Sequence, residues 1–169
     1  MPQTKMTTLF ERLRRLALLA LLACLAACGP GTGGTGTGPV QGVLNFSGSN
    51  AQGALPSGLQ CQGGCDEVRL KLEAQRVELA AGCRRFVHTG DWLVAVDGKA
   101  TIDGQVETTT SAGTTAAPAT LQLQFSGRDA DSPQVTALLV GEGGGVLAGP
   151  AVLQRGEGSA PAAPPVCSP

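Results

Sequence analysis

Cysteine offers most of the potential chemistry in this chain of 169 residues, which has six cysteines and a single histidine. One histidine excludes a zinc site built on several histidines. The cysteines beyond the N-terminal region are Cys61, Cys65, Cys83 and Cys167. The Cys61-x3-Cys65 spacing has no matching second pair, which argues against zinc. We therefore expect no metal and no cofactor, and two disulfides if the chain is exported to an oxidising compartment.

A histidine-dependent hydrolase is a second chemical possibility. Asp91 lies three residues after His88 and can orient the imidazole, while a serine from elsewhere supplies the nucleophile. No serine lies in a Gly-x-Ser-x-Gly motif, however. A histidine at the end of a strand followed by an aspartate in a turn gives the same pattern without catalysis. We expect a protein that is not an enzyme and keep the hydrolase as an alternative.

A third possibility is a calcium- or carbohydrate-binding module. Asp129 and Asp131 offer carboxylates to calcium, but their segment lacks the glycine and the distal glutamate of a complete calcium loop. Trp92, the only tryptophan, can stack on a sugar or pack in a core. An acidic solvent-exposed loop and a packed tryptophan are the simpler interpretations. The weak candidates for ligand binding are thus Trp92, His88, Asp129 and Asp131.

The first 28 residues have the composition of an export signal. Four cations precede an apolar run of 12 residues, Leu16–Ala27; they are Lys5, Arg12, Arg14 and Arg15. A membrane-spanning helix needs about 20 apolar residues, so the run is typical of a signal peptide rather than of a spanning segment.

The end of this run, Leu25-Ala26-Ala27-Cys28, resembles the lipobox of bacterial lipoproteins, in which a small residue precedes an invariant cysteine. The resemblance implies cleavage before Cys28, a diacylglycerol on the Cys28 thiol and a membrane partner reached through this lipid. It also implies the bacterial cell envelope, with the outer membrane favoured where two membranes exist because Gly29, not aspartate, follows Cys28. The resemblance covers residues 1–28 alone.

The number of cysteines gives an independent argument for the cleavage position. Cleavage before Cys28 leaves four cysteines besides the lipidated one, an even number that fits two disulfides. Cleavage at the competing sequence Leu21-Leu22-Ala23-Cys24 leaves five and one odd thiol. Cys61–Cys65 in a tight ring and Cys65–Cys83 at the base of a hairpin are both possible pairings.

Composition divides the chain into four parts: a signal peptide (1–27), a lipidated cysteine with a Gly-rich tether (28–39), a β-rich domain (40–155) and a Pro/Ala-rich tail (156–169). Cys167 predicts that the tail is attached to the domain. We predict a low-complexity loop at 108–118. The formal charge of −1 argues against a nucleic-acid partner.

The domain has the pattern of an all-β fold, since most apolar segments alternate with period two. Segments 40–46 and 121–125 alternate, 135–140 is mostly apolar, and 146–153 is interrupted by Gly149-Pro150. Asp97-Gly98 predicts a hairpin in which Leu93 and Ala95 share an apolar face with Ala100 and Ile102. Seven or eight short strands indicate a small antiparallel β-sandwich or barrel, linked by disulfides.

Residues 66–81 are the contested segment. Their composition favours a helix and hence an α+β fold, with Asp66 as N-cap. Their periodicity favours a hairpin that turns at Ala74-Gln75, because Val68, Leu70 and Leu72 then meet Ala81, Leu79 and Val77 on one face. We predict the hairpin, although Ala-Gln is poor turn chemistry.

These features together predict a membrane-anchored envelope lipoprotein. Its non-catalytic β-domain would bind or make structural contact with another envelope protein or an external ligand.

Overall fold

The computed structural model describes residues 40, 42–49, 60–61, 65–127, 129–156 and 166–168, with the backbone alone at 60–61. The predicted signal peptide, Cys28 and the tether lie outside the described residues, as do the Cys61 side chain and most of the tail. The described residues contain no helix. Their strands are β1 (Leu44–Ser49), β2 (Gln60–Cys61), β3 (Glu67–Glu73), β4 (Arg76–Ala81), β5 (Arg84–Thr89), β6 (Lys99–Thr110), β7 (Gly113–Phe125), β8 (Gln134–Gly141), β9 (Val146–Arg155) and β10 (Cys167–Ser168).

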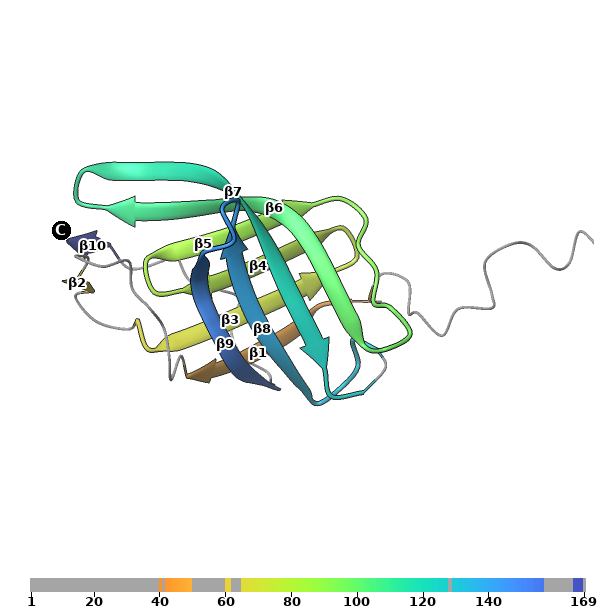
Figure 1. The fold of residues 1–169 in the computed structure, drawn as a ribbon. Helices are drawn as coiled ribbons and strands as arrows, with labels where there is room; N and C mark the ends of the chain where they lie inside the picture. Colours follow the sequence, from red (N-terminus) through yellow and green to blue (C-terminus); the bar gives the residue numbers. More distant parts are fainter. Residues whose placement is uncertain are drawn as a thin grey trace, which may run out of the picture. The chain divides into compact units, whose positions relative to one another are not determined.

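Eight of these strands form a closed antiparallel barrel (Figure 1). They follow the order β1-β3-β4-β5-β6-β7-β8-β9, and β9 pairs with β1 to close it. Beside the barrel, β10 pairs in parallel with β6 and antiparallel with β2. The all-β prediction is confirmed, and of its two architectures the barrel is the one adopted.

Alternating side chains fill the inside of the barrel. In β3, for example, Val68, Leu70 and Leu72 are buried while the charged residues between them face outward. An eight-stranded barrel is just wide enough for its interior to be filled by side chains. Phe46 and Phe125 meet edge to face there, with ring centroids 6.4 Å apart. The domain thus has one continuous core.

The contested segment 66–81 is a hairpin, as predicted, and the alternative helix is wrong. Leu72 pairs with Val77, Leu70 with Leu79 and Val68 with Ala81. The tertiary structure compensates for the poor turn residues. Trp92 Nε1 donates to the Glu73 carbonyl at 2.8 Å, and Gly90 N donates to the Gln75 carbonyl at 2.9 Å.

The predicted loop at 108–118 is wrong, because β6 and β7 stay paired throughout this segment. Thr109 is opposite Thr114 and Thr110 is opposite Gly113, with Ser111 and Ala112 between the strands. Threonine is β-branched and suits a strand. The register is set farther along, where Ile102 and Leu121 pair on the core face.

The hairpin predicted around Asp97-Gly98 is only partly formed. Gly98 has a φ of +77° and its N–H donates to the Ala95 carbonyl at 2.9 Å, so the turn exists. Residues 92–95 form no strand, however, and Leu93 is exposed instead of lying on an apolar face. The alternation is opposite to the predicted one because Trp92 and Val94 are the residues that pack into the core.

Candidate functional site

The two ends of the barrel differ, and every weak ligand-binding candidate lies at one of them. We call it the Trp92 end: it comprises the β3–β4 turn, loop 90–98 and the β7–β8 connection at 126–133. His88 and Trp92 reach it at the end of β5 and just beyond, and the β7–β8 connection brings Asp129 and Asp131. The opposite disulfide end carries the Cys83–Cys167 bond and the β6–β7 turn.

Trp92 packs in the core at its end of the barrel. Its side chain is 5% exposed and its indole N–H is bonded to the Glu73 carbonyl. A platform for a sugar needs an open aromatic face. The geometry therefore gives Trp92 a packing role, which also fixes the β3–β4 turn.

His88 and Asp91 make separate contacts. The His88 Nδ1 lies 2.7 Å from the Asp103 carbonyl, and since a carbonyl only accepts, Nδ1–H is the donor. Asp91 Oδ1 instead accepts from Gln75 Nε2 at 3.5 Å. The other ring nitrogen, Nε2, is buried and has no hydrogen-bond partner among the described residues. The backbone carbonyl of Asp103 therefore orients this imidazole, which is the role that the hydrolase hypothesis assigns to Asp91.

Asp129 and Asp131 make contacts that hold the connection between β7 and β8. The Ser132 hydroxyl donates to the Asp129 carbonyl at 2.6 Å and accepts from Gly127 N at 2.9 Å. Asp131 Oδ1 pairs with Arg155 Nη1 at 3.2 Å. In the part of the chain that the structure describes, no three histidine, cysteine or acidic residues gather to hold a metal ion.

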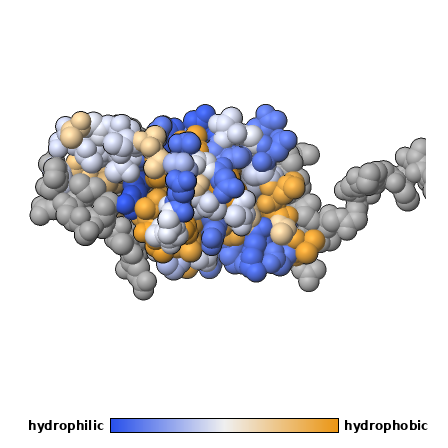
Figure 2. Space-filling view, turned by 45° about the horizontal axis from the view of Figure 1, so that its top comes forward, coloured by the Kyte–Doolittle hydropathy of each residue, from blue (hydrophilic) through white to orange (hydrophobic). Residues whose placement is uncertain are grey.

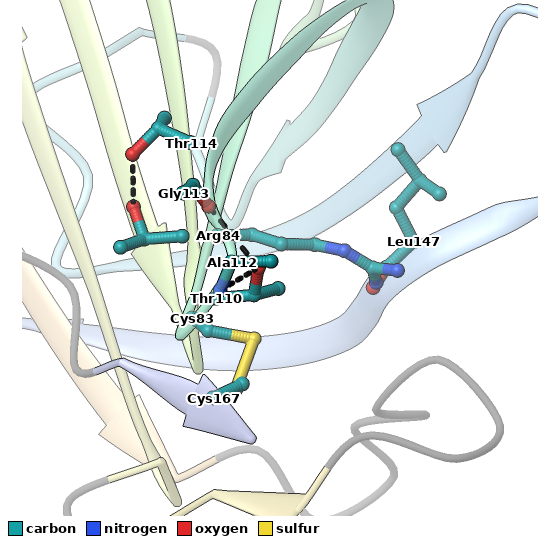
Figure 3. The surroundings of a disulfide bond; sticks show 9 residues. Cys83, Arg84, Thr110, Ala112, Gly113, Thr114, Leu147 and Cys167 are labelled. Atoms are coloured by element: carbon teal, nitrogen blue, oxygen red, sulfur yellow. Dashed lines mark hydrogen bonds between the residues drawn. A yellow bond between two sulfur atoms is a disulfide. The ribbon is translucent and has the colours of Figure 1, made fainter. Parts of the chain in front are cut away.

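The disulfide end is held together by the Cys83–Cys167 bond (Figure 3). Both cysteines are buried, and the backbone around them is bonded to the β6–β7 hairpin: Thr109 N donates to the Cys83 carbonyl and Ser111 N to the Cys167 carbonyl, each at 3.0 Å. The prediction that Cys167 attaches the tail is confirmed. The alternative Cys65–Cys83 pairing is wrong, because Cys83 is bonded to Cys167; Cys65 is itself disulfide-bonded.

Arg84 is a buried charge at this end that the sequence reasoning missed. Its guanidinium points across the barrel toward Leu147 and its Nη1 donates to the Leu147 carbonyl (Figure 3). Burial lowers the pKa of Arg84 from its usual value. No carboxylate of the described residues forms an ion pair with it. Alternation in β5 was the available signal, since it places Arg84 on the same inward face as Phe86.

Two further surface features lie at the disulfide end with Arg84. Residues 113–118 of β7 are exposed and, among the described strands, pair with β6 alone, because β8 begins to pair at Ala119. This segment offers an open strand edge to another chain. A shallow depression of about 320 Å³ lies where β1 ends and β3 begins, and is lined by Ser47, Gly48, Ser49, Asp66 and Glu67.

Among the residues that the structure describes, no helix has the length and apolar character needed to cross a membrane. Comparison of the chain with protein-family models, with curated proteins and with solved structures gave no match.

Proposed function

We propose that this chain is a lipid-anchored protein of the bacterial cell envelope whose barrel is a binding or structural module rather than a catalyst. One observation carries the proposal: a cation-flanked apolar run of signal-peptide length ends at Leu25-Ala26-Ala27-Cys28. Lipid on Cys28 would hold the domain at a membrane without a spanning helix. Two acyl chains are enough for stable anchoring, whereas one binds only marginally.

The disulfides support export. Cys83 and Cys167 are bonded to each other and Cys65 is also in a disulfide. Such bonds persist in oxidising compartments and are rare in the cytosol. With Cys28 reserved for lipid, the cysteines beyond it are even in number.

The open edge of β7 supports the binding part of the proposal. Residues 113–118 extend the β6–β7 hairpin beyond the barrel wall (Figure 1), and their outward backbone groups can pair with a strand of another envelope protein. The outer face of this hairpin is rich in threonine and alanine, so main-chain hydrogen bonds rather than deep pockets would supply the contact.

The anchor is tested by expressing the full chain in a bacterium and measuring the mass of the purified product. We expect a product that begins at Cys28 and carries diacylglycerol. Cys28→Ser is expected to give an unlipidated and uncleaved precursor. Cys24→Ser is the matched control, because it alters the competing sequence four residues earlier and should leave the mature product unchanged.

A bare full-length product in the cytosol would refute the anchor. Lipidation lost in Cys24→Ser and retained in Cys28→Ser would move the attachment site to Cys24.

A further inference from the structure

The Trp92 end exposes large apolar side chains that the core does not use. Leu93 is 69% exposed, Val96 59% and Val43 51%. Leu93 and Val96 belong to the same loop, whose Trp92 and Val94 point the other way and are buried. Figure 2 shows hydrophobic surface at the right-hand end of the coloured part of the chain. Single exposed apolar residues are ordinary on a protein surface, but here two of them share one loop and a third lies at the same barrel end; we call the three residues the apolar patch.

The start of the described chain lies at this same end. Val40 is buried in the core cluster and Leu44 begins β1 opposite Leu72, next to the β3–β4 turn. Eleven residues, 29–39, separate Val40 from Cys28. A Gly-rich segment of that length has a root-mean-square reach of roughly 18 Å and a maximum of about 40 Å. Of all parts of the barrel, the Trp92 end is therefore the one joined most directly to a lipid on Cys28.

We propose that the Trp92 end rests on the lipid bilayer, with Leu93, Val96 and Val43 entering the interface between headgroups and acyl chains. This inference rests on the lipid anchor proposed above. A few apolar side chains bind lipid weakly on their own. A short tether makes such contact effective because it turns a second binding event into an intramolecular one at millimolar effective concentration.

The charges of this end indicate which lipid surface it fits. Asp91 and Asp97 flank the exposed apolar residues, and Asp97 pairs with Lys99 at 2.9 Å. Among the described residues of this end, no run of lysine and arginine accompanies the patch, so attraction to anionic lipid is not its basis. A zwitterionic surface is the expected partner, and contact should change little with salt. The disulfide end, with the open edge of β7, would then face away from the membrane.

Trp92 provides the test, because it is the only tryptophan and adjoins Leu93. The mature lipidated protein is reconstituted into phosphatidylcholine vesicles that contain phosphatidylcholine brominated at shallow or deep acyl positions. We expect quenching of Trp92 fluorescence, stronger with the shallow bromines and unchanged by salt. The double variant Leu93→Ser with Val96→Ser should lower the quenching at least twofold. Val146→Ser with Val152→Ser is the matched control, since both valines are exposed on β9 outside this patch.

The outcomes separate this inference from the anchor. Unquenched Trp92 in a protein whose mass includes the lipid overturns the bilayer contact and leaves the anchor standing. A mass without lipid refutes the anchor and the contact together. Unquenched Trp92 in a protein that dimerises through Leu93 and Val96, measured by sedimentation of both double variants, assigns the patch to a second copy and also overturns the contact.

Discussion

Gly104 shows how closely the barrel wall approaches its own core. A Cβ built there lies 2.6 Å from Phe86 Cζ and 2.6 Å from the Val87 carbonyl oxygen. Real Cβ atoms do not approach other heavy atoms that closely. Gly48 is constrained in the same way, by the Val152 carbonyl on β9. Both glycines lie inside the barrel, where the absence of a side chain lets neighbouring strands pass each other around large aromatic and leucine side chains.

We predict that Gly104→Ala lowers the free energy of unfolding by about 1–3 kcal/mol, as expected for overpacking of a filled core. Gly143→Ala is the control: it lies in the β8–β9 turn, where a Cβ has no neighbour within 4 Å, and should change stability by less than about 0.5 kcal/mol. Urea denaturation measures both. Equal effects of the two substitutions would contradict the close packing of Gly104 against Phe86.

Two arginines surround a buried carboxylate on the outer face of β4 and β5. Glu78 on β4 is buried and accepts hydrogen bonds from Arg76 and from Arg85 Nη2, the latter at 3.2 Å. Burial alone would raise the pKa of Glu78. The two arginines outweigh that effect, and the pKa of Glu78 lies below its usual value. On the outer face, β4 and β5 are thus joined by the Arg85–Glu78 ion pair as well as by apolar contacts inside.

The direction of this pKa shift predicts how stability depends on pH. A carboxyl whose pKa is lowered by folding stabilises the folded state above its unfolded pKa, and the contribution is lost as the pH falls below about 4.3. We expect Glu78→Gln to make the unfolding free energy fall less steeply between pH 6 and pH 3 than in the wild type. Chemical denaturation across that range measures it.

Glu67→Gln is the control for Glu78→Gln, because Glu67 is exposed although it too pairs with an arginine, Arg69, at 2.7 Å. Solvent and salt screen this exposed ion pair, so it should contribute little to the free energy of unfolding. A pH profile that changes in Glu67→Gln and stays the same in Glu78→Gln would show that the exposed pair, not the buried one, dominates.

Strand pairing and a disulfide bond both stabilise the barrel as a whole. Pairing of β1 with β9 and of β6 with β7 closes the barrel wall, whereas residues 113–118 of β7, beyond the wall, keep an open edge among the described strands. The Cys83–Cys167 bond then joins residues 84 positions apart and fixes the C-terminal segment beside β6. A cross-link over so long a loop stabilises chiefly by restricting the unfolded chain.

We predict that replacing both cysteines, Cys83→Ala with Cys167→Ala, lowers the unfolding free energy by about 2–5 kcal/mol. Thermal unfolding with and without a reductant measures it. The effect of reductant that remains in the double variant reports the disulfide of Cys65. An unfolding free energy equal to that of the wild type would show that the bond does not restrict the unfolded chain.

Periodicity in the sequence was enough to predict the fold class. Alternation of Val68, Leu70 and Leu72 with charged residues predicted a strand against the helical composition of 66–81, because burial of one face outweighs intrinsic propensity. Composition gave a wrong prediction at 108–118, because threonine, alanine and glycine are also typical of a loop. The segment is a hairpin because β6 is paired with β5 and β7 is paired with β8 on either side of it. From the sequence, the candidate residues could be chosen only by residue type. Their grouping at one end could not be predicted, because it follows from closure of the barrel.

The sequence by itself determined the alternation that makes an all-β core and the presence of cysteines able to link it. Only the tertiary structure decided that the sheet closes, that Cys83 bonds Cys167, and which residues of loop 90–98 face inward. The physical reason is the distance along the sequence over which each feature is determined. Alternation is a property of neighbouring residues. Closure, disulfide pairing and the burial of Trp92 instead depend on residues tens of positions apart, which meet only once all eight strands are in register.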